Sequence, residues 1–140
     1  MRVVLGTSVL VAGFRSRTGA SNVLLQAVAK GKLQPLVSTA LFLEYEDVLL
    51  RPEHRLVTGM SEADVEAALG AFASAAEPVE VHFRWRPQLA DPSDELVLEA
   101  AVNGAAEFLV THNVRDFASA ADKFELAVVT PQRCLKEIKR

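Results

Sequence analysis

Strand-like and helix-like segments alternate along the whole chain, and this alternation limits the possible folds more than any other feature of the sequence. Short apolar runs predict strands at residues 2–5, 33–37, 79–83, 108–111 and 126–130. Alternation of this kind is typical of parallel βαβ units. We therefore expect an α/β protein with a central parallel sheet and helices on both faces. Pro35 indicates that the second strand lies at an edge or starts irregularly.

Helix signals fill the intervals between these strands. Serine residues are expected to cap three of the helices, at Ser21, Ser38 and Ser61. A further helix is predicted at residues 91–103, and Pro131 begins a last short one. Crossovers in such units are right-handed, so the loops that follow the strands gather at one edge of the sheet. Ligands of open parallel sheets bind at that edge, and its polar residues are the candidates for function.

Asp94 is the acid whose position is hardest to explain as ordinary surface. On a helical wheel of residues 94–105 it lies in the middle of the apolar arc, whereas Glu95 and Glu99 fall on the side expected to face solvent. An acid in a first helical turn gains from the helix dipole, and Asp91 is a good cap. Neither explains an inward carboxylate, which needs a partner such as a cation.

Glu44 is a second candidate, on the helix that follows Ser38. It lies beside the apolar stripe of that helix, while Glu46 and Asp47 point away from it. A boundary residue that reaches back to water explains its position equally well. Its role therefore depends on whether it meets Asp94 in the fold.

The fourth predicted strand delivers a polar cluster to the carboxyl edge. Asn113 and Asp116 carry the short oxygen donors that suit Mg²⁺ or Mn²⁺. Asn and Asp also favour turns for local reasons, so turn formation is the alternative. His112 is interpreted as a loop residue, because the spacing of the histidines matches no zinc site.

The first strand ends in Gly6, Thr7 and Ser8. The two hydroxyl groups can bond a ligand or a neighbouring carboxylate, or they can cap the segment that follows. The chain contains neither a G-x-x-x-x-G-K-[ST] nor a G-x-G-x-x-G pattern, so this is not a glycine-rich phosphate loop.

Composition fits one domain over residues 1–140 that is located in the cytoplasm. The single cysteine suits a reducing compartment, and no apolar run is long enough to span a membrane. The net charge of −3 does not indicate a nucleic-acid binder, although local patches of positive charge matter more than the net charge. Arginine pairs at residues 15 and 17, 51 and 55, and 84 and 86 are candidates for such patches, and a solvated surface is the alternative for each.

Three stretches of the sequence are VVLGTSVLVAGF, STALFLEYEDVLLRPEH and DPSDELVLEAAVNGAAEFLVTHNVRDF. They resemble the PIN-domain family, in particular the toxin components of bacterial toxin–antitoxin pairs, and the resemblance runs over nearly the whole chain. The resemblance implies a three-layer α/β/α fold that holds Mg²⁺ or Mn²⁺ with a group of acids and cleaves RNA. It also implies an antitoxin protein as a possible partner, a homodimer, and no contact with membranes.

The resemblance assigns roles to particular residues. Glu44, Asp94 and Asp116 match the family's catalytic, metal-binding acids, and Ser8 and Asn113 match polar residues that support the metal site. The family's first metal-binding aspartate is replaced here by Gly6, in the motif Gly6-Thr7-Ser8. One anionic ligand is therefore missing from the implied site.

Two other functions are compatible with parts of the pattern. A degenerate PIN domain that binds RNA or a protein without cleaving it is favoured by Gly6. A phosphoacceptor receiver domain would need paired acids after the first strand and a lysine after the last, and the sequence has neither. If the nuclease interpretation holds, the first and fourth strands are neighbours, and at least one clustered acid has a raised pKa.

Overall fold

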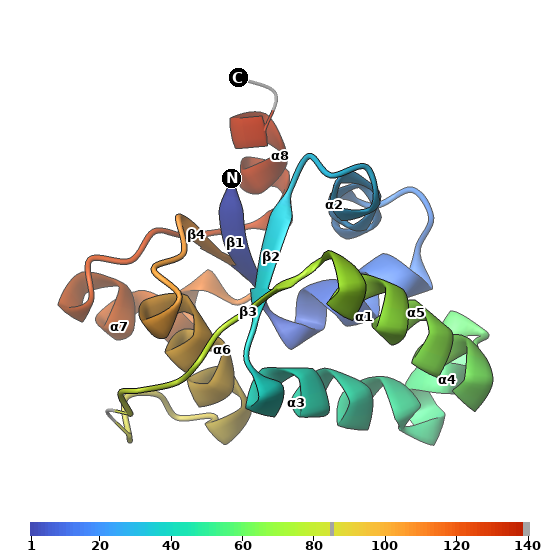
Figure 1. Ribbon diagram of the computed structural model, residues 1–140, viewed down its shortest axis with the longest axis horizontal. Coiled ribbons are helices and arrows are strands. Elements are labelled where there is room, and N and C mark those ends of the chain that lie inside the picture. Colours follow the sequence, from blue (N-terminus) through green and yellow to red (C-terminus); the bar gives the residue numbers. More distant parts are fainter. Residues whose placement is uncertain (85, 139–140) are drawn as a thin grey trace.

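The computed structural model describes residues 1–84 and 86–138, and its strands form one parallel sheet (Figure 1). The strand order is β3-β2-β1-β4-β5. The strands are β1 (Arg2–Leu5), β2 (Gln34–Val37), β3 (Glu77–Pro78), β4 (Phe108–Val110) and β5 (Val128–Val129). β1 pairs with β4 from Val3↔Phe108 to Leu5↔Val110, so their carboxyl ends are adjacent, as the sequence predicts.

Helices cover both faces of the sheet and complete the predicted three-layer α/β/α arrangement. The helices are α1 (Thr7–Arg15), α2 (Ala20–Ala29), α3 (Thr39–Leu50), α4 (Pro52–Thr58), α5 (Glu62–Ala75), α6 (Pro92–Asn103), α7 (Ala118–Lys123) and α8 (Pro131–Ile138). In Figure 1, α6 and α7 lie on one side of the strands, and α1, α2 and α5 lie on the other. α3 passes below the carboxyl ends of the strands and packs against both α1 and α6. Among the described residues, no helix is both long enough and apolar enough to cross a bilayer.

The core explains why β1 is the central strand of the sheet and β4 one of its two neighbours. Both strands are short apolar runs, and Leu5 and Val110 are completely buried between the helical layers. Tyr45 of α3 is also fully buried, and its hydroxyl donates a hydrogen bond to the carbonyl of Leu5. Its ring meets Phe72 of α5 edge-on, with centroids 5.9 Å apart. The hydrogen bond from Tyr45 to Leu5 attaches α3 to the carboxyl end of β1, where the functional site is expected.

Most predicted helix starts are confirmed, and one is wrong. The Ser38 hydroxyl accepts a hydrogen bond from the backbone N–H of Leu41, and Ser61 forms a complete capping box with Asp64. Ser21, in contrast, lies inside α2, which begins after Gly19. The hydroxyl of Ser21 shares a hydrogen bond with His112 instead, so it serves a tertiary contact rather than a cap.

Two expectations about strands are also wrong. β3 spans only Glu77–Pro78, and the chain leaves the sheet after Val79, whose N–H still donates to the carbonyl of Val37 at 3.0 Å. The backbone N–H groups of His82 and Phe83 donate to the side-chain oxygen of Asn103 on α6. These hydrogen bonds take the place of those that a neighbouring strand would accept. For Pro35 the predicted edge position is wrong, because β2 is an interior strand, whereas the alternative of an irregular start agrees with the structure: β2 pairs with β1 from Gln34 but with β3 only from Leu36. The missing N–H of proline is therefore not needed there.

Glu95 and Glu99 are buried rather than exposed, with relative exposures of 5% and 4%. We call residues 82–84 and 86–89 the strap, because their contacts cover the face of α6 that carries the two acids. Glu95 accepts hydrogen bonds from the backbone N–H groups of Gln88 and Leu89. Glu99 forms a bidentate ion pair with the Arg86 guanidinium, whose Nε and Nη2 donate to the two carboxylate oxygens at 2.5 and 2.7 Å. Both buried carboxylates thus have the partners that burial requires.

Candidate active site

A hollow of about 180 Å³ lies at the carboxyl edge of β1 and β4, and we call it the acidic pocket. Segments far apart in the sequence meet there: the β1–α1 junction, α3, the start of α6 and the loop after β4. The described residues that line it are Gly6, Thr7, Ser8, Glu44, Val48, Arg51, Asp91, Ser93, Asp94, Thr111 and Asn113. The structure therefore brings together all but one of the residues predicted to form a site.

Glu44 faces this pocket from α3 and is held by a contact that the sequence did not reveal. Its Oε1 accepts a hydrogen bond of 2.8 Å from the hydroxyl of Ser93. Ser93 is itself in the first turn of α6, where its backbone N–H donates to the capping carboxylate of Asp91 at 2.9 Å. The sequence offered only a local signal for Ser93, its position between Asp91 and Asp94 at a helix start. The bond connects the helix of Glu44 to the helix of Asp94.

Asp94 is partly buried in the first turn of α6. Its pKa is raised to about 6, mainly because burial removes water from the carboxylate, and further because of the nearby charges of Asp91, Asp116 and Glu95. The sequence predicted a raised pKa from repulsion between acids. The raised pKa is confirmed, but desolvation contributes more to it than repulsion.

Asp116 is the candidate acid that does not line the acidic pocket. It is exposed on a 3₁₀ turn, Val114–Phe117, although its charge still acts on Asp94. Asn113 lines the pocket, and its backbone N–H donates to the Thr111 hydroxyl at 3.1 Å. Its carbonyl also accepts from the N–H of Asp116, so Asn113 has the turn role that was its alternative interpretation. That role uses only backbone groups, so the side-chain amide oxygen of Asn113 is left to bind a cation.

Gly6 has an ordinary extended backbone, with φ −64° and ψ 153°, so no left-handed conformation demands glycine. Its N–H donates to the carbonyl of Val110 at 2.7 Å. A Cβ at this residue would lie 3.2 Å from that same oxygen and 3.5 Å from Thr111. A side chain there requires a shift of a few tenths of an ångström and would begin at the wall of the acidic pocket. The hydroxyl of the next residue, Thr7, is buried and has no partner within the described part of the chain.

The donors at this edge fit a magnesium-type ion in kind but are few in number. Glu44 and Asp94 offer carboxylate oxygens and Asn113 an amide oxygen, the ligand type that Mg²⁺ and Mn²⁺ prefer. Within residues 1–84 and 86–138, however, no three His, Cys, Asp or Glu side chains are grouped closely enough to hold a metal by themselves. Mg²⁺ commonly uses one or two carboxylates together with waters and substrate phosphate, and the pocket can supply that smaller set.

A second hollow adjoins the acidic pocket and has the opposite character. Its volume is about 370 Å³, and Arg15, His54 and His112 line it. The prediction that His112 is a loop residue is confirmed, but it also shares a hydrogen bond of 3.0 Å with Ser21. Burial and the nearby Arg15 lower the pKa of His112. We call this hollow the basic pocket.

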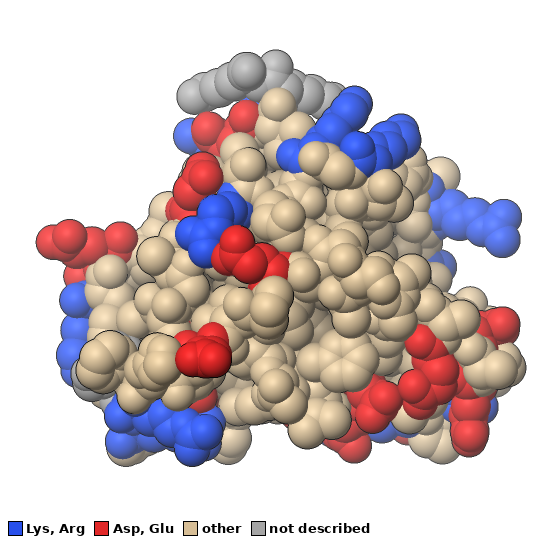
Figure 2. Space-filling view, viewed as in Figure 1, with Lys and Arg blue, Asp and Glu red and all other residues tan. Residues whose placement is uncertain are grey.

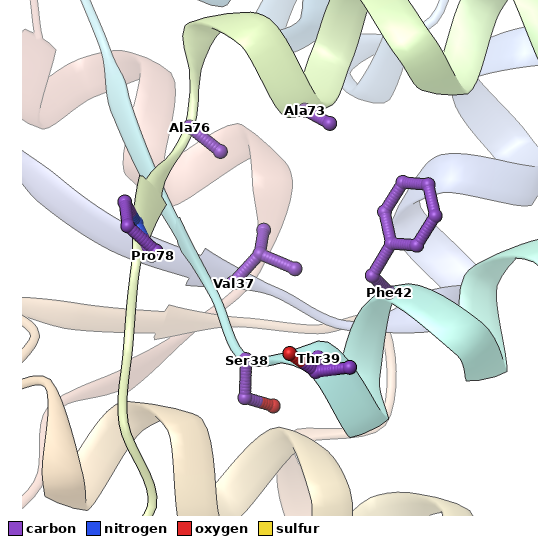
Figure 3. Close-up of a pocket in the computed structure, with 7 residues that line it drawn as sticks. All are labelled: Val37, Ser38, Thr39, Phe42, Ala73, Ala76 and Pro78. Carbon is purple, nitrogen blue, oxygen red and sulfur yellow. The ribbon is translucent and has the colours of Figure 1, made fainter.

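Figure 3 shows a third hollow, between α3 and α5 beside the edge strand β3. Its described lining residues are Val37, Ser38, Thr39, Phe42, Ala73, Ala76 and Pro78. Phe42 and the alanines give it apolar walls, and the hydroxyls of Ser38 and Thr39 lie at one end. No charged side chain is among these lining residues, so the groove lacks the groups that phosphate or metal chemistry needs.

Sheet order, helical layers and the position of the acids together define the class of protein. The PIN domain family matches residues 2–115, and the chain belongs to this family. Among solved structures, the fold is similar to a chain in the crystal structure of VapBC2 from Rickettsia felis bound to a DNA fragment from their promoter. The TM-score is 0.62 at 16% identity, over 93% of this chain and 98% of that one. A search of curated proteins finds no match.

Proposed function

We propose that this PIN domain is a metal-dependent ribonuclease whose active site is weakened by Gly6. The main support is the acidic pocket, where Glu44 and Asp94 meet at the carboxyl edge of β1 and β4. These two acids and Asp116 are the proposed catalytic and metal-binding residues. Ser8 and Asn113 supply further oxygen donors at the same edge.

The residues of the pocket suggest a division of tasks. Glu44 and Asp94 would hold Mg²⁺ or Mn²⁺, which when bound lowers the pKa of a water molecule and offsets charge on the reacting phosphate. Ser93 orients Glu44 through its hydroxyl hydrogen bond. Partial burial keeps Asp94 away from bulk water, which strengthens its interaction with a cation. Asp116 adds negative charge from the loop after β4 without entering the pocket wall.

Gly6 also supports a second candidate, a PIN domain that binds RNA or a protein without cleaving it. The residue stands where the family has its first metal-binding aspartate, at the wall of the acidic pocket. The remaining acids do not form a group of three among the described residues. A domain with this deficit can keep its binding surface while its rate of cleavage falls.

The wider setting follows from the resemblance of the sequence to toxins of toxin–antitoxin pairs and from the similarity of fold to a VapBC2 chain. We propose an antitoxin protein as partner, a homodimer as the working assembly, and a cytoplasmic location. We further propose that residues 1–140 form one domain, because the sheet is built from strands that span nearly the whole chain.

A cleavage assay on Gly6→Asp tests the proposal directly. The new carboxylate adds one anionic ligand, and loss of even a supporting group in a metal site costs on the order of 10–100-fold. We expect Gly6→Asp to cleave single-stranded RNA at least about tenfold faster than the wild type in the presence of Mn²⁺. Gly6→Asn is the matched control, since it has the same shape without the charge.

Contaminating nucleases are excluded by a second substitution in the same protein. Glu44→Gln introduced into Gly6→Asp should return the rate to background, because Glu44 lies in the same pocket. Activity that is unchanged or lower in a folded Gly6→Asp protein would contradict a nuclease that lacks one ligand. That result would favour the binding module.

A further inference from the structure

The acidic and basic pockets are neighbours with a common wall. Thr7, Ser8 and Val48 line both of them. The acidic pocket carries Glu44 and Asp94, whereas none of the described residues lining the basic pocket is acidic. Thr7 and Ser8, at the start of α1, therefore separate a pocket with negative side chains from a pocket with a positive one. We propose that the basic pocket binds a backbone phosphate of single-stranded RNA, next to the phosphate that lies at the acids.

Three elements bring the groups of the basic pocket together. Arg15 ends α1, His54 lies on α4, and His112 follows β4. α1 packs against α4, which holds the first two on adjoining helices. Arg15 is exposed and forms no ion pair with any residue that the structure describes. Its guanidinium is thus available to an anion, unlike Arg51 in the acidic pocket, which pairs with Asp47 at 2.9 Å.

A phosphodiester chain matches this pair of pockets better than a single small anion does. If one phosphate of a strand lies at a metal held by the acids, the next phosphate along the strand can be neutralised by the cationic group of the adjoining pocket. Guanidinium and imidazole N–H groups form charge-assisted hydrogen bonds to phosphate oxygens. Such backbone contacts position a strand without reading its sequence. The inference rests on the proposed ribonuclease function, since it assigns the path of the substrate beside that site.

Arg15 also has a purely structural explanation, because a cation in the last turn of a helix is favoured by the helix dipole. The two roles predict different losses. A structural role affects thermal stability, whereas a phosphate contact affects how RNA binding depends on salt. Binding of a single strand weakens with salt in proportion to the number of phosphates that the protein neutralises. The salt dependence therefore separates the two roles.

The probe is a fluorescent, uncleavable 2′-O-methyl RNA oligonucleotide, titrated in EDTA so that neither metal nor cleavage contributes. We expect Arg15→Gln to weaken binding, and to reduce the slope of log K against log salt by about 0.7, the value for one phosphate contact of a single strand. Arg15→Lys keeps the charge and should retain the slope. Arg17→Gln is the matched control, an exposed arginine two residues further on that does not line the basic pocket.

Several outcomes would overturn the proposal. They are equal slopes for Arg15→Gln and Arg17→Gln, or no measurable binding of the oligonucleotide by the wild type. Binding of a polyglutamate peptide through Arg15, with no binding of RNA, would assign the pocket to an acidic protein segment instead. Because the assay contains no metal, the subsite can stand even if Gly6→Asp fails to cleave RNA. It can equally fail while cleavage is observed.

Discussion

Three acids of one helix show how strongly the surroundings of a single residue decide its role. Asp94, Glu95 and Glu99 all belong to α6, and all three are shielded from water to some degree. Glu95 and Glu99 have hydrogen-bond donors in the strap, which compensate their burial. For Asp94 the raised pKa shows that burial and neighbouring acids outweigh any compensation. An uncompensated carboxylate of this kind is what a cation would stabilise.

The raised pKa of Asp94 predicts how stability varies with pH in metal-free buffer. Between its ordinary pKa of 3.8 and about 6, the folded state keeps a proton that the unfolded state releases. The contribution of Asp94 to stability therefore falls as pH rises through this window. Asp94→Asn removes the charge, so its melting temperature should exceed that of the wild type by more at pH ~7.5 than at pH ~4.

Partial exposure of Asp94 makes the effect smaller than the raised pKa alone implies, because solvent screens the carboxylate. Asp122→Asn is the control, since Asp122 is exposed on α7, does not line the acidic pocket and is not among the charges that raise the pKa of Asp94. A difference between Asp94→Asn and the wild type that is the same at both pH values would show that Asp94 keeps its ordinary pKa. Thermal unfolding followed by circular dichroism is sufficient to measure it.

At the scale of elements, the strap fixes the helix that carries Asp94. Glu95, Glu99 and Asn103 are spaced by four residues on one face of α6, and each bonds the strap. This row explains why the face is polar yet buried. It also explains why His82 and Phe83, at the end of the predicted strand 79–83, belong to the strap: the side chain of Asn103 accepts the hydrogen bonds that a neighbouring strand would otherwise accept.

Breaking the Arg86–Glu99 pair should cost different amounts depending on which partner is removed. Arg86→Met leaves the Glu99 carboxylate buried without a cation, which should cost about 3 kcal/mol of unfolding free energy. Glu99→Met leaves Arg86, whose side chain is 44% exposed and can turn towards water. The cost of that variant should be about 1 kcal/mol, as for an ordinary lost hydrogen bond.

Urea unfolding measures both variants of this pair. Arg51→Met is the control, because it breaks the exposed pair with Asp47 and should cost less than about 0.5 kcal/mol. If Glu99→Met proves the more destabilising of the two, the carboxylate does not depend on Arg86 for its burial. The strap would then be held mainly by the contacts of Glu95 and Asn103.

Elements with strong local signals could be predicted from the sequence, and those set by tertiary contacts could not. β1 and the caps at Ser38 and Ser61 follow from apolar runs and capping residues. α4 was missed because Pro52, which signals the end of α3, is also its first residue. The helical wheel placed Glu95 and Glu99 in solvent, since a wheel of one helix cannot show that the strap covers that face.

The candidate site could be predicted in outline for a similar reason. In a parallel sheet the loops that follow the strands lie at one edge, so Glu44, Asp94 and Asn113 were expected to meet there. Ser93 was missed because its bond to Glu44 depends on how α3 and α6 pack. The basic pocket was missed as well, because Arg15, His54 and His112 share no spacing in the sequence.

At the scale of the whole molecule, charge is unevenly distributed. Figure 2 shows acidic side chains gathered over α3, α4 and α5, at the lower right of the view. Glu46 and Glu62 lie close enough to Glu66 to raise its pKa. A net charge of −3 therefore hides a local excess of acid on these helices. An RNA strand would be repelled there, so the basic pocket is the more suitable path towards the acids.

Metal binding should couple the stability of the whole molecule to the charge at residue 6. Without metal, Gly6→Asp adds a carboxylate beside Glu44 and Asp94, so it should melt below its neutral isostere Gly6→Asn. A ligand that binds only the folded state stabilises it by about 1.4 kcal/mol at ten times its Kd, which is roughly 5 °C for a chain of this size. As Mn²⁺ rises from zero to millimolar concentration, the melting temperature of Gly6→Asp should therefore climb past that of Gly6→Asn. The wild type should climb less than Gly6→Asp, because it offers one ligand fewer. Melting temperatures that do not respond to Mn²⁺ in any of the three proteins would contradict a metal site at this edge of the sheet.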